Sequence, residues 1–345
     1  MDISTQSDFT ENTAELEKPT TKRFLSNGIQ SSYDIPVYGL DNGDFYSIHI
    51  PAITCISLSF ISVLAVIVAS FKTKSIKTFF SWTKSERLVV YLALCDGLLN
   101  ISHALDHTQM IVTKNHVYPK ELCTFYAFML IEFVTAQNLM VSAVAFNVFV
   151  LIYFSKDLDF GKYDWHLLLY TFGIPCVGGT LAAIFDKLGP NGYSCYLDKV
   201  KGGVTIFFYT TAPLLAVLIT NIILYGLTWK RIRSESRRLQ NTLGQEVATT
   251  RSAIKAGKTM LLFVTAFFIQ WWPLSLYGIW QLIAPVPLAV FQFVITFSNV
   301  GGVLNGIVYI IIRRRRTKMK QKKTMKKKEF QSIATICDGV KDSST

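Results

Sequence analysis

The sequence predicts an all-α membrane protein, a bundle of seven transmembrane helices with the N-terminus outside and the C-terminus in the cytoplasm. Half of the 345 residues are hydrophobic and only 17% are charged. The mean hydropathy of +0.34 is too high for an ordinary soluble domain. Seven apolar stretches reach about 18 residues or more, enough to span a bilayer. They are 50–71, 88–105, 123–154, 165–185, 202–229, 260–283 and 286–312.

The distribution of basic residues predicts the orientation. Lys and Arg are concentrated in the first loop, in the fifth loop and after Ile312, which all fall on one side of a seven-span chain. Loops rich in Lys and Arg remain in the cytoplasm, so the N-terminus is expected outside. The net charge of +12 is therefore interpreted as a topology signal that also attracts anionic inner-leaflet lipid. Nucleic acid is not an expected partner.

Three regions are expected along the chain. Residues 1–47 are polar and acidic and are expected to form a disordered extracellular tail. They contain no apolar run that could act as a cleavable signal, so the first span is expected to direct its own insertion. Residues 48–312 form the seven-helix transmembrane domain. Residues 313–345 form a basic cytoplasmic tail that is expected to lie along the inner leaflet.

The second span contains Asp96 near its middle. A carboxylate at that depth is costly unless it faces the bundle interior, so Asp96 is a functional candidate. Because no Lys or Arg lies in any span, Asp96 is expected to be solvated by amides, water or a small cation, or to be protonated. The alternative is a neutral acid that only bridges helices.

At the outer end of the second span, His103, Asp106 and His107 share one helical face. Their spacing permits metal binding. A cluster of this kind more often lines a wet extracellular vestibule, and this is the favoured interpretation.

The third span is the longest, at 32 residues, and Glu132 is its only formal charge. A helix of that length measures about 48 Å against about 30 Å of hydrocarbon, so it must tilt or protrude and should contact many neighbours. Cys123 begins this span, and Cys195 lies in the fourth loop. They are placed in or beside outward-facing loops, where oxidation is possible. If the topology holds, a bond between them would attach the fourth loop to the third span.

The sixth span carries the expected hinge. Pro273 should bend the sixth span, and Trp271 lies within the turn that this proline disrupts. An aromatic residue beside a hinge can couple pocket occupancy to helix movement, whereas Trp272 is interpreted as a packing or interface aromatic. Gly301-Gly302 in the seventh span permits close helix approach or a local break. The basic fifth loop, 230–258, suits docking of a cytoplasmic protein, although its charges can also serve topology alone.

Taken together, these residues resemble a rhodopsin-like G-protein-coupled receptor at scattered positions across spans two to seven. The matching segments are Leu92-Ala-Leu-Cys-Asp96, Cys123 with Cys195, Trp165 with Pro175, Pro213, Gln270-Trp271-Trp272-Pro273 and Asn305-Gly-Ile-Val-Tyr309. Six such segments in the family's order on the expected spans make the resemblance specific.

The sequence also departs from the family pattern. Asn147-Val148-Phe149 occupies the place of Asp-Arg-Tyr, which removes the arginine that normally contacts the G protein. The segment from Ala145 to Phe149 is similar instead to the third-span ending of cyclic-AMP-receptor-like and fungal nutrient-sensing receptors. Gly306 stands where the seventh span usually has proline.

The resemblance implies a set of site residues. A disulfide joins Cys123 to Cys195, and Asp96, Gln137 and Asn305 form a polar core that is a hypothetical sodium site. Otherwise no cofactor, metal or catalytic residue is expected. The expected ligand pocket is lined by Leu130, Val134, Trp271, Ser275 and Asn299. The expected switch residues are Trp271, Pro273, Asn147, Tyr225 and Tyr309.

The resemblance also implies a multi-pass receptor of the plasma membrane that binds an extracellular ligand and a heterotrimeric G protein. The seventh span has no Lys for a retinal Schiff base, and Leu130 stands where aminergic receptors carry Asp. Glu132, two residues further on, faces a different way, at about 200° around the helix.

Two other classes of protein remain as alternatives. A transporter or channel would use Asp96 and Glu132, but the sequence has no internal repeat or discontinuous helix pair. A metal hydrolase would use His103 and His107, but the other three histidines are scattered.

Overall fold

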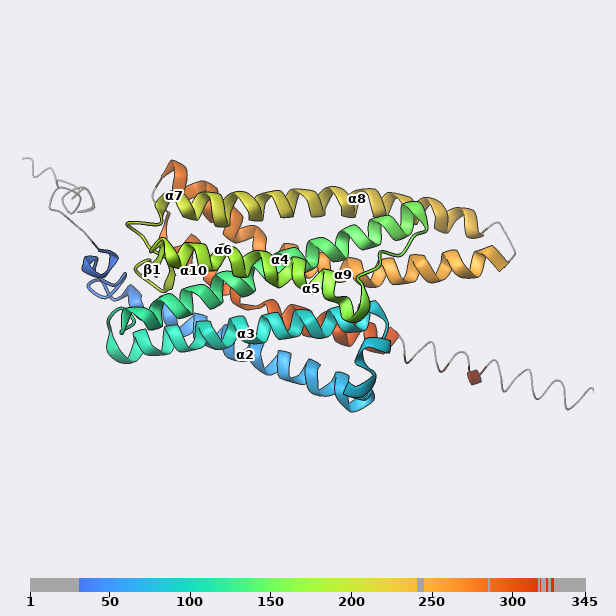
Figure 1. Cartoon of the computed structure of the whole chain (residues 1–345), viewed down its shortest axis with the longest axis horizontal. Helices are drawn as coiled ribbons and strands as arrows, with labels where there is room; N and C mark the ends of the chain where they lie inside the picture. Colours follow the sequence, from blue (N-terminus) through green and yellow to red (C-terminus); the bar gives the residue numbers. More distant parts are fainter. Residues whose placement is uncertain are drawn as a thin grey trace, which may run out of the picture.

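The computed structural model describes residues 31–240, 245–284 and 286–315, together with 317, 321, 324 and 325. Residues 1–30 of the expected extracellular tail and most of the expected cytoplasmic tail lie outside this part of the chain. The described residues form an elongated helical bundle (Figure 1).

The first three spans are single long helices. They are α2 (Asp44–Thr73), α3 (Lys84–Thr113) and α4 (Lys120–Phe154). A capping box at Thr83 and Glu86 begins α3, where the Glu86 carboxylate accepts from the Thr83 backbone N–H at 3.0 Å. Each helix contains the corresponding predicted apolar stretch and extends a few residues beyond it, because the flanking polar residues continue the helix.

The fourth and fifth spans each contain a π-helical turn. The fourth consists of α5 (Trp165–Leu168), a π-helical segment (Leu169–Gly173) and α6 (Ile174–Ile184). The fifth consists of α7 (Gly203–Ile206), a π-helical segment (Phe207–Thr211) and α8 (Ala212–Gln240). Each π-helical segment ends shortly before a proline, Pro175 or Pro213. A widened turn there accommodates a residue that cannot donate a backbone hydrogen bond.

The last two spans are α9 (Gln245–Ile283), which contains Pro273, and a bent pair. The pair consists of α10 (Leu288–Asn299) and the helix Gly301–Arg315, with an angle of 44° between them. Among the described residues, six helices are long and apolar enough to cross a membrane, and counting the bent pair as one span gives seven. The predicted seven-helix fold of a multi-pass membrane protein is therefore confirmed, and the predicted break at the glycine pair is present.

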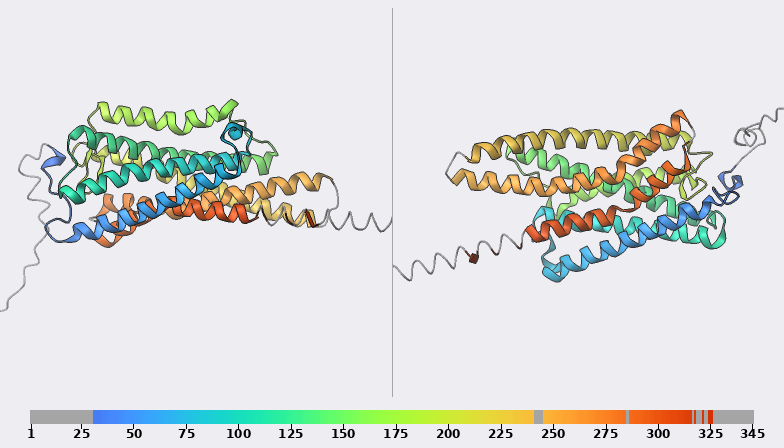
Figure 2. Two further views of the ribbon diagram at one scale, coloured as in Figure 1. Left: turned by 90° about the horizontal axis from the view of Figure 1, so that it is seen from below. Right: turned by 180° about the vertical axis from the view of Figure 1, so that it is seen from behind.

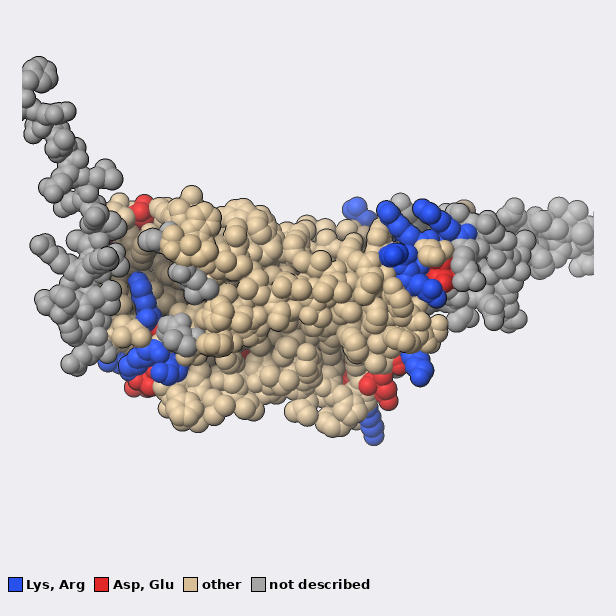
Figure 3. Space-filling view, turned by 90° about the horizontal axis from the view of Figure 1, so that it is seen from above, with Lys and Arg blue, Asp and Glu red and all other residues tan. Residues whose placement is uncertain are grey.

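The face of the bundle seen in Figure 3 has an uncharged middle and charged ends. Figure 3 shows Lys and Arg gathered at both ends of the molecule, with a long surface between them that carries neither basic nor acidic residues. This pattern fits a protein whose middle is surrounded by lipid.

The third span lies at the centre, as its length predicts. α4 packs against α3, α6, α8 and α9, and also against the hairpin described below. Its buried residues Met140, Val141 and Val144 join one large apolar cluster with Trp271 of α9. Figure 2 shows α2 and the last span side by side on one flank of the bundle.

A short β-hairpin covers one end of the bundle. Strands β1 (Leu188–Pro190) and β2 (Cys195–Leu197) are antiparallel and pair Pro190 with Cys195. The predicted disulfide is present: Cys195 is bonded to Cys123, with 5.3 Å between their Cα atoms. We call this end of the bundle the disulfide end. The opposite end, which holds loops 72–87 and 155–164, is the basic end.

Part of the expected disordered tail is folded. Residues 31–43 lie on the hairpin, and α2 begins at Asp44 rather than near residue 48. Ser32 Oγ donates to Asp198 Oδ1 at 2.6 Å, and the backbone N–H of Tyr38 donates to the carbonyl of Gly192 at 2.8 Å. These hydrogen bonds pair polar groups of the segment with the hairpin and hold it in place without a large apolar core.

Candidate functional site

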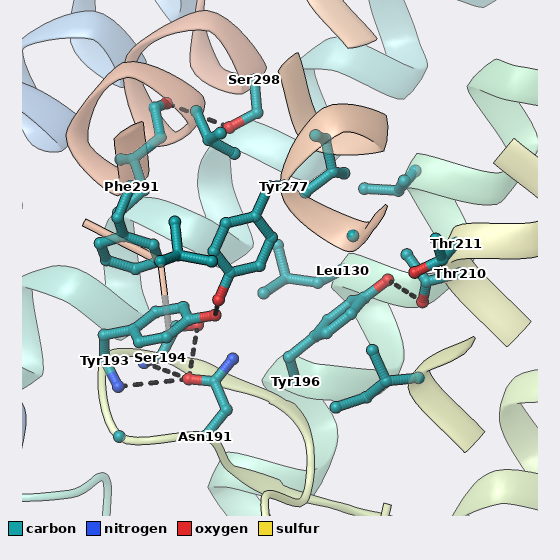
Figure 4. Close-up of a pocket in the computed structure, with 18 of the residues that line it drawn as sticks. Leu130, Asn191, Tyr193, Ser194, Tyr196, Thr210, Thr211, Tyr277, Phe291 and Ser298 are labelled. Carbon is teal, nitrogen blue, oxygen red and sulfur yellow. Dashed lines mark hydrogen bonds between the residues drawn. The ribbon is translucent and has the colours of Figure 1, made fainter. Parts of the chain in front are cut away.

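A cavity of about 820 Å³ lies at the disulfide end, between the hairpin and helices α3, α4, α8, α9 and α10. Figure 4 shows its aromatic walls, with Tyr193 and Tyr196 from the hairpin, Tyr277 from α9 and Phe291 from α10. A cavity of this size and apolar character is typical of a small-molecule site.

The hairpin turn orients the aromatic wall. Asn191 Oδ1 accepts hydrogen bonds from the backbone N–H groups of Tyr193 at 3.2 Å and Ser194 at 3.0 Å, which fixes the turn (Figure 4). The Tyr193 ring meets Phe291 edge-on at 4.2 Å between centroids, and its hydroxyl lies 3.4 Å from that of Tyr277. The hairpin therefore contacts the sixth and seventh spans across the cavity.

A second tyrosine links the hairpin to the fifth span. The hydroxyl of Tyr196 lies 3.0 Å from Thr210 Oγ1 (Figure 4). Thr210 belongs to the π-helical segment Phe207–Thr211, so the widened turn places this hydroxyl at the cavity wall. Sequence reasoning did not single out these tyrosines, because their role depends on how the hairpin folds over the bundle.

Four of the five expected pocket residues line this cavity: Leu130, Val134, Trp271 and Asn299. Ser275 is not among the lining residues. It is buried, with 4% of its surface exposed, and its hydroxyl has no hydrogen-bond partner among the described residues. The structure thus brings together most of the expected pocket, but places Ser275 outside it.

The floor of the cavity is connected to the middle of the bundle. Trp271 lines the cavity and is 1% exposed, and its Nε1–H donates to Gln137 Oε1 at 3.1 Å. Gln137 Nε2 donates to Asp96 Oδ1 at 2.6 Å, and Asn305 Nδ2 donates to Asp96 Oδ2 at 2.7 Å. These four residues, which we call the polar chain, run from the sixth span through the third and second to the seventh.

No family model matches the chain, and no curated protein matches it. Among solved structures, the crystal structure of squid rhodopsin matches with a TM-score of 0.55 and 16% sequence identity, over 77% of this chain and 81% of that one. The chain has a rhodopsin-like fold.

In this rhodopsin-like bundle the polar chain does not fit a sodium ion. Both oxygens of the Asp96 carboxylate accept hydrogen bonds from amide N–H groups. The carbonyl oxygen of Gln137 accepts from Trp271 instead of facing Asp96. A cation near Asp96 would meet amide hydrogens where it needs oxygen ligands, so the hypothetical sodium site is not formed in this arrangement.

The expected switch residues at the basic end lie apart. Asn147 is buried, and its Oδ1 accepts from the backbone N–H of Leu158 at 3.3 Å, which holds the loop that follows α4. Tyr225 stacks on Trp229 with 6.3 Å between ring centroids. Tyr309 packs against the large apolar cluster. Among the described side chains, no hydrogen bond joins Asn147 to either tyrosine.

An ion pair at the basic end, with side chains 11% and 3% exposed, was not predicted from the sequence. Arg87 of α3 donates from Nε and Nη2 to the two carboxylate oxygens of Asp164 at 2.6 and 2.7 Å. The Tyr91 hydroxyl donates to the same carboxylate at 3.0 Å. Asp164 precedes α5, so this bidentate pair joins the second span to the start of the fourth.

The three residues that share one face of the second span make two separate sets of contacts. Asp106 Oδ2 accepts from the backbone N–H of Cys195 at 2.9 Å and supports the hairpin. His107 instead lies between His49 of α2 and His103, with Nδ1 2.6 Å from His49 Nδ1 and Nε2 3.1 Å from His103 Nε2. His103 Nδ1 lies 2.8 Å from Asn299 Oδ1.

The alternatives to a receptor gain no support from this geometry. The three histidines contact one another in series and do not converge on a point, and the described residues contain no group of three or more metal-ligating side chains. For an ion path, neither Asp96 nor Glu132 is among the residues that line the cavity.

Proposed function

We propose that this protein is a G-protein-coupled receptor that transmits occupancy of its cavity to a G protein at the basic end. The observation that carries the proposal is the polar chain. Trp271 faces the cavity on one side and hydrogen-bonds Gln137 on the other, and Gln137 reaches Asp96 and Asn305 in the middle of the bundle. A ligand that moves Trp271 must therefore disturb contacts between four spans.

The proposed orientation places the disulfide end outside the plasma membrane and the basic end in the cytoplasm. Two observations support it. The Cys123–Cys195 bond is of a kind that persists in an oxidising compartment. The fifth loop and the chain after Ile312 are the parts richest in Lys and Arg, which favours their contact with anionic inner-leaflet lipid.

The proposed mechanism is a shift between two packings of the bundle. A ligand favours one packing only if it contacts the two differently. Pro273 lies two residues after Trp271 in α9, where the missing backbone hydrogen bond allows the helix to bend. Movement of α9 would open a cleft at the basic end, bounded by Asn147, Tyr225, Tyr309 and the fifth loop, where the G protein binds.

The residues that line the cavity favour binding of an uncharged or acidic ligand with a large apolar part. None of the described lining residues is Asp or Glu, and Lys199 is the one among them with a formal charge. Leu130 lies at the position where an amine receptor would place its carboxylate. An amine would therefore enter the cavity without a counter-ion, at a high desolvation cost.

A screen for G-protein dissociation in cells tests the proposal. The cells would express the receptor with each G-protein subtype and be exposed to a library of uncharged and acidic amphiphiles. Leu130→Trp fills the cavity, whereas Phe125→Trp changes a side chain on the same helix that is 54% exposed. We expect Leu130→Trp to abolish the response at normal surface expression and Phe125→Trp to retain it. An unchanged response in Leu130→Trp, or no response of any subtype, would contradict the proposal.

A further inference from the structure

Three of the five histidines form a continuous row of ring contacts near the disulfide end. His49 of α2 contacts His107 of α3, His107 contacts His103, and His103 ends the row at Asn299 of α10. We call His49, His107 and His103 the histidine chain. It connects the first, second and seventh spans, and two of its members, His103 and His107, line the cavity.

The hydrogen-bond partners fix which ring nitrogens carry hydrogen. Asn299 Nδ2 donates to the carbonyl of Ile295 at 2.9 Å, so its Oδ1 is the acceptor that faces His103. His103 must then carry its hydrogen on Nδ1 and accept at Nε2. His107 therefore donates from Nε2 and accepts at Nδ1, and His49 donates from Nδ1. All three contacts are satisfied when each ring is neutral, and all donate in one direction.

One nitrogen remains open in this arrangement. His49 Nε2 is buried and has no hydrogen-bond partner among the described residues. A proton added there leaves every hydrogen bond of the chain intact. A proton added at His107 Nδ1 or His103 Nε2 would instead set two N–H groups against each other. The chain therefore accepts one further proton, and it does so without breaking a contact.

The added charge can move along the chain. In each step one N–H bond of the donor ring breaks, and an N–H bond forms on the facing nitrogen of the next ring. Two steps carry the positive charge from His49 through His107 to His103, with all three hydrogen bonds kept. His103 lines the cavity, so a proton bound to the chain places positive charge beside a bound ligand.

The charged and titratable groups near the chain come from α3 and from the wall of the cavity. Asp106, next to His107 in α3, is the nearby acid, and its Oδ1 has no hydrogen-bond partner among the described residues. From α2, the ring of Phe45 packs on His49 at 4.3 Å between centroids. On the cavity side the titratable groups are the amine of Lys199 and the hydroxyls of four tyrosines, Tyr38, Tyr193, Tyr196 and Tyr277.

We propose that the histidine chain binds a single extracellular proton and that this proton regulates the receptor. Histidine is the side chain that changes charge near physiological pH. A charge shared by histidines of the first two spans would favour one packing of the bundle over another, and it would favour acidic ligands in a cavity whose described lining has no carboxylate. The inference rests on the proposed receptor function and orientation.

Nitrogen NMR of the full-length receptor tests the proton site without G-protein coupling. The protein would be labelled with ¹⁵N-histidine and placed in phosphatidylcholine nanodiscs. In the neutral chain we expect hydrogen on Nδ1 of His49 and His103 and on Nε2 of His107. On acidification the three rings should share one titration. Three independent titrations, or a different set of tautomers, would overturn the single site.

Signalling at different external pH tests the regulation. G-protein dissociation by the amphiphile that is active in the screen would be measured between about pH 8 and about pH 5.5. We expect its potency to change by about fivefold or more in the wild type. His107→Gln should remove this change, because glutamine can donate and accept but does not take up a proton. His116→Gln and His166→Gln should keep the wild-type profile.

The outcomes separate this inference from the receptor proposal. A wild-type response that is independent of pH, or a pH dependence retained in His107→Gln, overturns proton regulation. Loss of the pH dependence in His116→Gln assigns it to another histidine and also overturns the inference. In each of these cases the ligand response itself persists, so the receptor proposal stands.

Discussion

At the scale of single residues, the side chain of Gln137 connects the cavity to the polar middle of the bundle. Its amide nitrogen donates to Asp96, and its carbonyl oxygen accepts from Trp271. Asp96 was expected to be solvated by amides, water or a small cation, or to be protonated, because no Lys or Arg lies in a span. The sequence did not predict that the second atom of the same amide would bind Trp271, since that contact depends on how α9 lies beside α4.

We therefore expect Gln137→Leu to destabilise the protein. The substitution leaves Asp96 Oδ1 and Trp271 Nε1 buried with one hydrogen bond fewer, which costs about 1–3 kcal/mol for each group left unpaired. Thermal unfolding of the purified receptor measures the effect. The control is Asn138→Leu, because Asn138 is also buried on α4 but its Oδ1 has no hydrogen-bond partner among the described residues. Equal losses for the two variants would contradict the proposed role of Gln137.

At the scale of elements, the last span approaches the first span closely because of one glycine. The backbone N–H of Gly302 donates to Ser59 Oγ at 2.8 Å. A Cβ atom at position 302 would lie 2.6 Å from the carbonyl oxygen of Ser59. The sequence predicted that the glycine pair would permit close approach or a break, and the structure has both. It did not predict the partner, which lies on the first span.

Gly302→Ala should separate these two helices and lower stability by about 1–3 kcal/mol, the usual cost of overpacking. Gly306→Ala is the matched control on the same helix. A Cβ atom at 306 would lie 3.4 Å from Ser62 Cβ, which is ordinary contact. Thermal unfolding should therefore show a loss for Gly302→Ala only. An equal effect at both positions would mean that helix propensity, not packing, determines the result.

The ion pair between Arg87 and Asp164 joins two further elements at the basic end. Asp164 is 3% exposed, and its backbone has a positive φ of 58°, which Asn also tolerates. Asp164→Asn should cost about 1–3 kcal/mol, because Arg87 loses its counter-ion in a partly buried site but keeps its hydrogen bonds to the carbonyls of Phe80 and Trp82.

A double-mutant cycle with Arg87→Met measures that coupling by thermal unfolding. The double variant should recover part of the stability that Asp164→Asn loses. For comparison, Lys201→Met removes an ion pair with Asp186 whose side chains are 40% and 73% exposed, and it should cost at most about 1 kcal/mol. Purely additive losses in the Arg87 and Asp164 variants would contradict a direct contribution of the pair.

At the scale of the whole molecule, the sequence predicted the number and order of the spans because each rests on a local run of apolar residues. It predicted the disulfide from topology and resemblance. It could not predict contacts between distant segments: His49 and His107 are 58 residues apart, and the folded segment 31–43 needs the hairpin as its partner. Four of the five expected pocket residues line the cavity, whereas Ser275 does not, and the aromatic wall was not predicted.

The proposed mechanism depends on Trp271, which must transmit occupancy of the cavity to the polar chain. Trp271→Phe tests this most directly, because it keeps an aromatic ring at the cavity and removes the five-membered ring whose N–H binds Gln137. Trp272→Phe makes the same change in size. Trp272→Phe is the control, since Trp272 is 37% exposed and packs on Phe293.

The decisive measurement is ligand-induced G-protein dissociation at matched surface expression, with ligand binding measured in parallel. In Trp271→Phe we expect binding close to the wild type and a maximal response reduced about fivefold or more, the size of a typical coupling energy between sites. Trp272→Phe should behave as the wild type. A full response in Trp271→Phe would contradict transmission through the polar chain.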